Sequence, residues 1–433
     1  MFEKIFQLTK NKTTIRREVL AGITTFMTMA YILAVNPGIL SETGMDKSAL
    51  FTATALAAVI GTLVMAFVAK YPFALAPGMG LNAFFAFTVV IGMGYSWQFA
   101  LTAVLLEGVI FILLTAFNIR ELIVNSIPMN IKHSISAGIG LFIAFIGLQS
   151  ANIIVKDPAT LVHLGDMGSP SVLIALFGII LTGVLLAFKV KGALLIGILA
   201  ATVAGIPAGV THVPESHLVS APPSLDPIFF KFDFSRILSL DMLIVLFTFL
   251  FVDMFDTVGT LIGVSDKADM LDKDGKLPRA KQALFADSIA TTAGAFLGTS
   301  TVTTYVESAS GVAEGGRTGL TSFTVAIMFV LALFFAPVFT MIPQAATAPA
   351  LVLVGLFMIS PIKNINLDDF TEAIPAFFTM IIMRLTYSIG EGIVFGFLRY
   401  VLLKLLTVKH RQISLVMYVI AILFIIKFVM DVA

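Results

Sequence analysis

The sequence has no cysteine and little charge. Its 433 residues include no cysteine, so disulfides, thiolate nucleophiles and zinc–thiolate sites are excluded. Five histidines occur without an HExxH arrangement, which leaves little for metal chemistry. Charged residues make up 12% of the chain and hydrophobic residues 58%, whereas soluble proteins carry about 25% charged residues. The chain is therefore expected in a lipid bilayer, where carboxylates, amides and hydroxyls are its available chemistry.

The few charges are balanced in sign. The chain has 27 Lys and Arg against 26 Asp and Glu, a net charge of +1, so it has neither a basic excess for nucleic acid nor an acidic tail. We expect no nucleic-acid partner, no metal site and no cofactor.

Apolar stretches follow one another along nearly the whole chain. A spanning helix needs about 20 largely apolar residues, and such windows predict fourteen helices in two sets of seven. The first set is predicted at 18–40, 48–69, 73–93, 98–117, 131–151, 171–188 and 192–209. The second set is predicted at 240–264, 281–298, 305–316, 318–342, 345–360, 370–388 and 390–407. A further apolar stretch, 413–430, is either another span or a helix along the membrane surface.

The basic residues predict the orientation, because cytoplasmic loops retain an excess of Lys and Arg. With the N-terminus inside, most basic residues lie in the N-terminal segment, in the even-numbered loops and after the fourteenth helix. The residues left outside are Lys47, Lys156, Lys231 and Arg236. This predicts a multi-pass protein of the cytoplasmic membrane with a cytoplasmic N-terminus. No A-x-A-like site follows the basic start, so the first helix is interpreted as a retained anchor.

The two halves carry a weak internal repeat. When the chain is shifted by 234 positions, residues 47–71 fall on 281–305, and Lys47, Leu50 and Phe51 are among the matches. Seven is odd, so the second copy would be inverted relative to the first. Inverted repeats are an architecture of secondary transporters, whose substrate binds near the midplane between broken helices.

Corresponding breaks are predicted in the third and tenth helices. The third contains Pro77, Gly78 and Gly80, and the tenth contains Gly311 and the pair at 315–316. Proline removes a backbone donor and glycine lowers helix propensity, so both segments should include short extended backbone. Such backbone is tolerated in a membrane where it lines a cavity or is buried in protein. The two breaks should face each other across a pocket.

Acids inside predicted helices are the candidates for chemistry. Asp253 and Asp256 lie three residues apart in the eighth helix, on about the same face, and Glu307 lies in the broken tenth segment. An ionised group at midmembrane costs about 2.5 to 3.5 kcal/mol or more, so these residues should face a polar cavity, pair or carry protons. The alternative for Asp256 and Glu307 is a structural salt bridge or a helix-to-helix hydrogen bond, for example with Arg317 or Arg384.

Three further polar residues are candidates with a structural alternative. Asn82 in the broken third segment could line the pocket or pack between helices, and Thr28 could line the pocket or bond back to its own helix. Glu107 has no break beside it in the sequence, so a structural role is favoured for it. Arg384 has no evident partner.

The third, eighth and tenth segments together resemble the nucleobase/ascorbate transporter superfamily, and within it the AzgA-like branch of hypoxanthine/guanine/adenine permeases. The motifs concerned are Ala76-Pro-Gly-Met-Gly-Leu-Asn-Ala, Phe255-Asp-Thr-Val-Gly-Thr-Leu and Thr303-Thr-Tyr-Val-Glu-Ser. The resemblance implies an all-α polytopic fold of fourteen helices in two inverted sevens, with a core and a gate domain. In this chain the parts would be a cytoplasmic segment at 1–17, the core at 18–117 and 240–342, the gate at 118–239 and 343–408, and a C-terminal apolar segment at 409–433.

The resemblance also implies site residues. Glu307 matches the acid of the tenth helix and Asp256 that of the eighth, both of which bind the base in the superfamily. Gly80 and Asn82 match the third-segment residues of the purine branch, with Met79 beside them. Two departures are present: the eighth-helix acid is Asp where uracil and xanthine members have Glu, and the tenth segment has one more residue before its glycine. The shorter acid would leave room for a larger base.

The expected function is the import of a purine base by proton symport, with alternating access between the core and gate domains. Carboxylates accept hydrogen bonds from the ring N–H and exocyclic amine of a purine, while backbone N–H groups and Asn82 meet its acceptors. Asp253 or Asp256 is expected to carry the proton, and Glu307 mainly to hold the base and share in the coupling.

Other functions and several details stay open on the sequence alone. The alternatives are a same-fold transporter of uracil, xanthine or a small anion, and an intramembrane aspartyl protease, although paired protease aspartates normally lie on different helices. The particular base, the coupling stoichiometry, the mode of movement and a homodimer through the gate domain also remain open.

Overall fold

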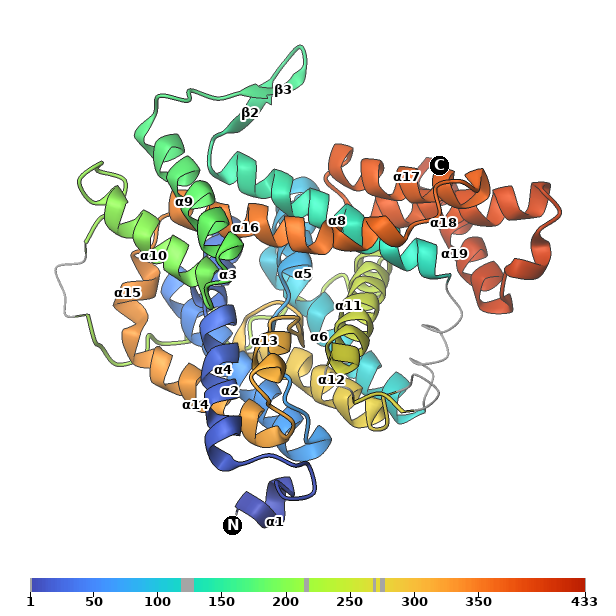
Figure 1. Ribbon diagram of the computed structural model, residues 1–433. Helices are drawn as coiled ribbons and strands as arrows, with labels where there is room; N and C mark the ends of the chain where they lie inside the picture. Colours follow the sequence, from blue (N-terminus) through green and yellow to red (C-terminus); the bar gives the residue numbers. More distant parts are fainter. Residues whose placement is uncertain (1, 118–127, 214–217, 268–269, 273–276, 433) are drawn as a thin grey trace.

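The protein is a bundle of helices in the computed structural model (Figure 1), which describes residues 2–117, 128–213, 218–267, 270–272 and 277–432. Within these residues, eight helical segments are long and apolar enough to cross a membrane. They are Ile15–Thr43, Lys47–Ala69, Trp97–Ala116, Met129–Ser150, Pro170–Ala187, Leu240–Ser265, Gly319–Thr340 and Gln344–Asn364. The prediction of a helical, multi-pass membrane protein is confirmed.

The helices of the first half coincide with the predicted apolar stretches. Their bounds are α2 Ile15–Met29, α3 Ile32–Leu40, α4 Lys47–Val64 with the π-helical turn η2 Met65–Ala69, α5 Met79–Ala83 with the π-helical η3 Phe84–Gly92, α6 Trp97–Ala116, α8 Met129–Ser150, α9 Pro170–Ala187 and α10 Ala193–Gly205. The first predicted helix is therefore two helices, which meet at Ala30 and Tyr31.

The second half agrees equally well. Its helices are α11 Leu240–Lys267, α12 Ala280–Leu297, α13 Ser308–Ala313, α14 Gly319–Ala332 with η4 Leu333–Phe335 and α15 Ala336–Thr340, α16 Gln344–Ile359 with η5 Ser360–Asn364, α17 Phe370–Leu385, α18 Ile389–Leu406 and, after η6 His410–Gln412, α19 Leu415–Val432. The stretch predicted at 413–430 is thus a helix that packs on α18.

A short strand interrupts the third predicted segment, and another lies just before the tenth, at 302–304 rather than at the glycines that indicated the break, of which Gly311 lies inside α13. The first strand, β1 Leu75–Pro77, precedes α5, and the second, β4 Val302–Thr304, precedes α13. The strands pair antiparallel, with Leu75 opposite Thr304 and Pro77 opposite Val302. Pro77 lies at the end of β1, where its missing N–H does not interrupt the pairing. All six strand residues are buried, so the extended backbone satisfies its hydrogen bonds inside the protein.

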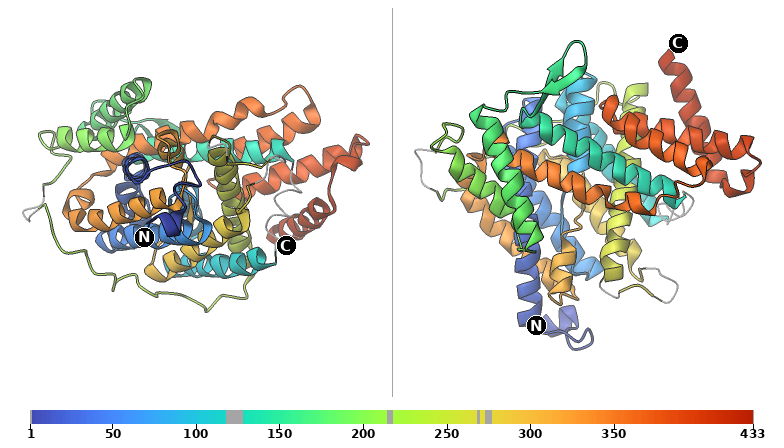
Figure 2. Two further views of the ribbon diagram at one scale, coloured as in Figure 1. Left: turned by 60° about the horizontal axis from the view of Figure 1, so that its bottom comes forward. Right: turned by 45° about the horizontal axis from the view of Figure 1, so that its top comes forward.

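Two features outside the helices were not predicted. A β-hairpin of β2 Ile154–Asp157 and β3 Leu161–Leu164 follows α8 and projects from the bundle (Figure 1), so the all-α expectation is wrong for this segment. Residues 218–239 run as a long, mostly irregular segment around the bundle (Figure 2, left). Backbone bonds from Ser220 to Phe334 and from Phe230 to Phe296 attach this segment to η4 and α12.

A buried carboxylate determines where α14 begins. Glu18 on α2 is fully buried, and its Oε2 accepts hydrogen bonds from the hydroxyls of Thr318 at 2.9 Å and Thr321 at 2.6 Å. Its Oε1 accepts from the backbone N–H of Arg317 at 2.9 Å. Helix N-termini leave backbone N–H groups without intrahelical partners, and Glu18 supplies acceptors from a segment that is about 300 residues away in sequence. The first helix is thereby joined to the second half of the chain.

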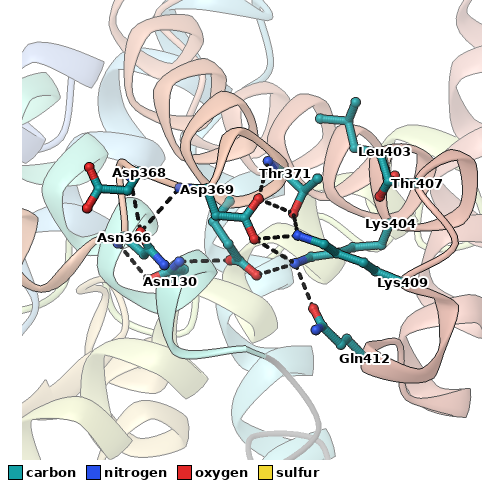
Figure 3. A network of polar contacts seen from close by, with 11 residues as sticks. Asn130, Asn366, Asp368, Asp369, Thr371, Leu403, Lys404, Thr407, Lys409 and Gln412 are labelled. Atoms are coloured by element: carbon teal, nitrogen blue, oxygen red, sulfur yellow. Dashed lines mark hydrogen bonds and ion pairs between the residues drawn. The ribbon is translucent and has the colours of Figure 1, made fainter.

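A second polar network joins α8, α17, α18 and η6 (Figure 3). Lys404 on α18 is 1% exposed, and its Nζ lies 2.6 Å from Glu372 Oε1 and 2.7 Å from Gln412 Oε1. Glu372 in turn accepts from Asn130 of α8 at 2.8 Å, and Lys409 donates to Asp369 at 2.7 Å. A buried ammonium is tolerated because it is paired and hydrogen-bonded in this way.

Candidate substrate site

The two broken segments hold each other in place through backbone and tyrosine contacts. The Gly78 N–H donates to the Thr301 carbonyl at 3.0 Å, and the Tyr305 N–H donates to the Ala74 carbonyl at 2.9 Å. The Tyr305 hydroxyl donates to the Pro77 carbonyl at 2.5 Å. The helices that follow, α5 and α13, therefore begin at fixed positions beside the same small sheet. Segments separated by more than 200 residues together define one site.

Glu307 lies at the N-terminal end of α13 and is half-buried. Its Oε1 accepts a hydrogen bond of 2.6 Å from the hydroxyl of Tyr31. Tyr31 is buried at the junction of α2 and α3. A hydrogen bond to a charged acceptor is about twice as strong as a neutral one, so Tyr31 orients this carboxylate. The predicted acid therefore has a partner from the first predicted helix.

Asp256 on α11 is half-buried and faces the same group of acids. The carboxylates of Asp287 on α12 and Glu307 both lie close enough to act electrostatically on Asp256, and Tyr305 is close to both Glu307 and Asp256. The two acids that the sequence singled out, Asp256 and Glu307, are therefore brought together. Asp287 was not predicted and joins them.

Asp253 takes part in a separate buried contact, one helical turn before Thr257. The Thr257 hydroxyl lies 2.9 Å from Asp253 Oδ1 and 2.9 Å from Asp287 Oδ1. All three side chains are fully buried. A hydroxyl has a single proton to donate, so it donates to one carboxyl and accepts from the other when a proton is bound there. The two carboxyls and the hydroxyl are therefore placed so that a proton bound to either carboxyl would complete both contacts.

Asn82, Gly80 and Met79 occupy the first turns of α5. Asn82 is fully buried, and its Oδ1 accepts a hydrogen bond from the Ser300 hydroxyl. Its Nδ2 has no hydrogen-bond partner among the described residues, so a donor remains for another molecule. A Cβ on Gly80 would come within 2.9 Å of Ile139 on α8. Glycine at this position therefore lets α5 approach α8 closely.

The remaining candidates have structural contacts. The Thr28 hydroxyl donates to the Thr25 carbonyl at 2.8 Å, the back-bonding that was the alternative for it. Arg317 donates to the carbonyls at the end of α13, Val312 and Gly316, each at 2.8 Å. Arg384, which had no evident partner, stacks 4.1 Å from the ring centroid of Phe145. The salt bridges considered for Asp256 and Glu307 are thus absent from the described contacts of these two arginines.

Glu107 is placed differently from what its sequence position indicated. It lies fully buried on α6, and its Oε2 accepts from the Thr301 hydroxyl at 2.5 Å. Thr301 directly precedes β4. Glu107 therefore contacts the tenth-segment break, and the inference that it lacks such a neighbour is wrong. The reason is tertiary, because α6 and residue 301 meet only when α6 packs on α12.

Sequence reasoning missed three side chains of this site. Asp287 lies inside an apolar helix, so the criterion that selected Asp253 also applies to it. Thr257 follows Asp253 by four residues, which places both on one helix face. Tyr31 carries no comparable local signal, because a buried tyrosine hydroxyl usually has a hydrogen-bond partner but the sequence does not indicate which one.

A cavity of about 470 Å³ lies beside the site. Its lining is mainly apolar and comes from η3, the first half of α11, the turn between α17 and α18, and α19, with Phe84, Phe247, Phe251 and Phe424 among its residues. The clustered acids are not part of its wall. Phe84 and Phe251 lie close in sequence to α5 and Asp253, so the cavity approaches the site from one side.

Comparisons with known proteins give the family. The family model described as "Permease family", that of the xanthine/uracil permeases, matches residues 16–395. The chain belongs to this family. It is 53% identical to the putative permease MJ0326 of Methanocaldococcus jannaschii, with 99% of this chain and 98% of that protein covered. It is 44% identical to the adenine permease AdeP of Escherichia coli (99% and 96% covered) and 46% identical to the guanine/hypoxanthine permease PbuG of Bacillus subtilis (98% and 98% covered).

The fold is also found in solved structures. The transmembrane domain of the cyanobacterial bicarbonate transporter BicA has a TM-score of 0.66 at 14% identity and covers 88% of this chain and 97% of its own. At that identity the likeness concerns the fold alone. The resemblance to the nucleobase/ascorbate transporter superfamily is confirmed, and the protein is a permease rather than an enzyme. The protease alternative is therefore wrong.

Proposed function

We propose that this permease imports a purine nucleobase, such as hypoxanthine, guanine or adenine, across the cytoplasmic membrane. The observation that carries the proposal is the electrostatic proximity of Asp256 to Glu307, which lies at the start of α13 after the paired strands. An amide donor without a partner among the described residues, on Asn82, lies at the start of the other helix that follows these strands. Relatives that share nearly the full length are named as adenine and guanine/hypoxanthine permeases.

The chemistry of a purine fits these groups. Its ring N–H and exocyclic amine are donors for the two carboxylates, while the Asn82 amide and the backbone N–H groups at the start of α5 meet its acceptors. The same acids disfavour the small-anion alternative, because Asp253, Asp256, Asp287 and Glu307 would repel a negative substrate. The fold shared with a bicarbonate transporter does not alter this argument, since function depends on the site.

Uptake competition tests the substrate. Cells or proteoliposomes with the protein are expected to take up radiolabelled hypoxanthine, and unlabelled purines should displace it better than uracil. Glu307→Gln and Asp256→Asn should each lower uptake by about tenfold or more, because a hydrogen bond to a charged group is lost. An absence of purine-displaceable uptake would overturn the proposal.

The length of the acid at position 256 is proposed to favour purines over uracil. Asp has one methylene fewer than Glu, which leaves more space opposite Glu307. Asp256→Glu is therefore expected to shift the preference from purines toward uracil in the same competition assay. A variant that keeps its full purine preference would count against this part.

We further propose proton symport, with Asp253 and Asp287 sharing the coupled proton. The support is the Thr257 hydroxyl at 2.9 Å from both carboxyls, a geometry that one added proton satisfies completely. Asp256 and Glu307 lie beside this pair, so loading the base and loading the proton affect the same group of charges. No cofactor other than the proton is involved in this scheme.

The pH dependence of uptake tests the proton assignment. Wild-type uptake is expected to fall as external pH rises, and Asp253→Asn and Asp287→Asn should remove most of that dependence. Thr257→Ser keeps the hydroxyl and is the matched control. If both Asn variants transport with an unchanged pH profile, the proton is carried elsewhere.

The same proposal includes an architecture of fourteen helices in two inverted sevens, with a core and a gate domain that move to give alternating access. The packing supports it, because contacts between the two halves have counterparts in which the halves are exchanged: α6 packs on α12 as α14 packs on α4, and α17 packs on α8 as α9 packs on α16. A cytoplasmic N-terminus follows from the basic residues. A homodimer through the gate domain stays a prediction.

A further inference from the structure

Glu107 is a buried acid outside the group proposed to bind base and proton. It is 0% exposed on α6, a helix held tightly against α12. A Cβ on the next residue, Gly108, would come within 2.4 Å of the Thr292 hydroxyl and 2.8 Å of the Thr292 backbone nitrogen. This close packing of α6 on α12 fixes the position of the helix backbone next to Glu107.

The contact that Glu107 makes is with the residue that joins both breaks. Its Oε2 accepts from the Thr301 hydroxyl at 2.5 Å. The carbonyl of the same Thr301 accepts from the Gly78 N–H at 3.0 Å, and Gly78 is the residue at which α5 begins. One threonine thus connects Glu107 to the start of the helix that carries Gly80 and Asn82.

The neighbouring residue strengthens the connection. Ser300 donates through its hydroxyl to Asn82 Oδ1. Thr301 therefore positions the start of α5, and Ser300 positions the candidate binding amide. Hydrogen bonds that involve a charged group are the stronger kind. An apolar residue at position 107 would leave the buried Thr301 hydroxyl without this acceptor, and glutamine would leave it only a weaker, neutral one.

We propose that Glu107 is a positioning residue for the substrate site, which holds the start of α5 in place through Thr301. It does not touch the base itself. The expected effect of Glu107 on substrate affinity rests on the proposed transport function. Its effect on the backbone position at the start of α5 is independent of any substrate.

Two substitutions and two controls test the role. Glu107→Gln and Thr301→Val keep the size of the side chain and remove the charge-assisted bond. Both are expected to raise the KM for hypoxanthine about tenfold, with the maximal rate per inserted molecule within about twofold of wild type. Thr301→Ser retains the hydroxyl and should restore wild-type KM. Thr115→Val on the same helix changes another buried threonine that lies away from the breaks and should have no effect.

The double variant and hydrogen exchange complete the test. If both residues act through one bond, Glu107→Gln with Thr301→Val should be no worse than either change alone. Hydrogen exchange of the amides at residues 78–83 should be faster in both single variants than in Thr301→Ser, with or without hypoxanthine.

Unchanged hydrogen exchange at residues 78–83 in Glu107→Gln and Thr301→Val would overturn the inference. A wild-type KM in Thr301→Val would also overturn it. The same holds if the variants lose thermal stability but keep the wild-type KM and exchange. A wild-type protein without purine uptake would contradict the proposed function, and the exchange result would still decide the role of Glu107.

Discussion

At the scale of single residues, the site depends on side chains that orient other side chains. Tyr31 donates to Glu307 at 2.6 Å, and Thr257 bridges Asp253 and Asp287. A carboxylate in a membrane protein has few ways to be solvated, so its direction is set by the donors that reach it. These hydroxyls therefore determine which carboxylate oxygens remain for a ligand.

Removing the Tyr31 hydroxyl tests whether this side chain orients the Glu307 carboxylate. Tyr31→Phe is expected to raise the KM for hypoxanthine about three- to tenfold, because Glu307 loses the donor that orients it. Thr28→Val, one turn earlier, is expected to leave uptake unchanged, since the Thr28 hydroxyl bonds to its own helix. Equal effects of the two substitutions would favour a pocket role for Thr28 and argue against the orienting role of Tyr31.

A charged residue outside the spanning segments offers a pH control. The hydrogen bond from Lys409, together with those from Thr371, lowers the pKa of Asp369 well below its ordinary value. The stabilisation from a depressed pKa is present above the unfolded pKa and is lost only as pH falls through the lower folded pKa. Asp369 therefore stays charged across about pH 5 to 8.

Asp369→Asn is the matched control for the proton assignment. Asp369→Asn should leave the pH profile of uptake unchanged, in contrast to Asp253→Asn, when initial rates are measured at several external pH values. A profile flattened by Asp369→Asn would show that the network in Figure 3 takes part in the pH response.

At the scale of elements, residues without a bulky side chain determine how closely two helices pack. Gly319 begins α14 where it meets the π-helical turn η2, and a Cβ there would lie 2.0 Å from the Ala66 carbonyl oxygen. Gly183 in α9 has open space around its Cβ position, with nothing within 4 Å. The two glycines thus have opposite structural roles, although both lie in helices.

Substitution by alanine should separate these roles. Gly319→Ala is expected to destabilise the protein by about 1 to 3 kcal/mol, because the helices must move apart. Gly183→Ala should stabilise it by up to about 1 kcal/mol, because alanine favours the helix. Denaturation of the purified protein in detergent measures both, and a neutral Gly319→Ala would contradict the close crossing.

At the scale of the whole molecule, several polar side-chain contacts among the described residues cross between the proposed core and gate domains. One is the ion pair of Lys191, between α9 and α10, with Glu314 at the end of α13, and both side chains are largely exposed. Exposed pairs contribute about 0 to 1 kcal/mol, so this one is weak enough to break when the domains move. It lies on the side proposed to be cytoplasmic.

A cross-link at this position is expected to stop transport. The chain has no cysteine, so Lys191→Cys with Glu314→Cys provides the only two thiols for a short, reducible bifunctional reagent. Uptake should be lost on cross-linking and recover on reduction. The same reagent on Asp369→Cys with Lys409→Cys should leave uptake intact, because that pair joins the gate to the C-terminal segment that follows it and does not involve the core. Full uptake by the cross-linked first pair would contradict movement at this contact.

How far the sequence predicts the protein differs between features. Hydropathy locates the eight long apolar helical segments of the described residues to within a few residues, because each presents about 20 apolar residues to lipid. Pro77 locates the break in the third segment, because its backbone preference is local, whereas the extended backbone of the tenth break lies at 302–304, before the glycines that indicated it. The β2–β3 hairpin was missed, since its short strands carry no strong alternation.

The sequence by itself therefore determined the membrane setting, the long apolar helices, the break at Pro77 and the acids Asp256 and Glu307, because each depends on neighbouring residues and on the cost of charge in lipid. Only the tertiary structure decided the partners of those acids. Tyr31 with Glu307, Thr257 with Asp287 and Glu107 with Thr301 join residues 276, 30 and 194 positions apart. Such pairs form when packed helices bring distant donors and acceptors together in a medium without water, and no local pattern specifies them.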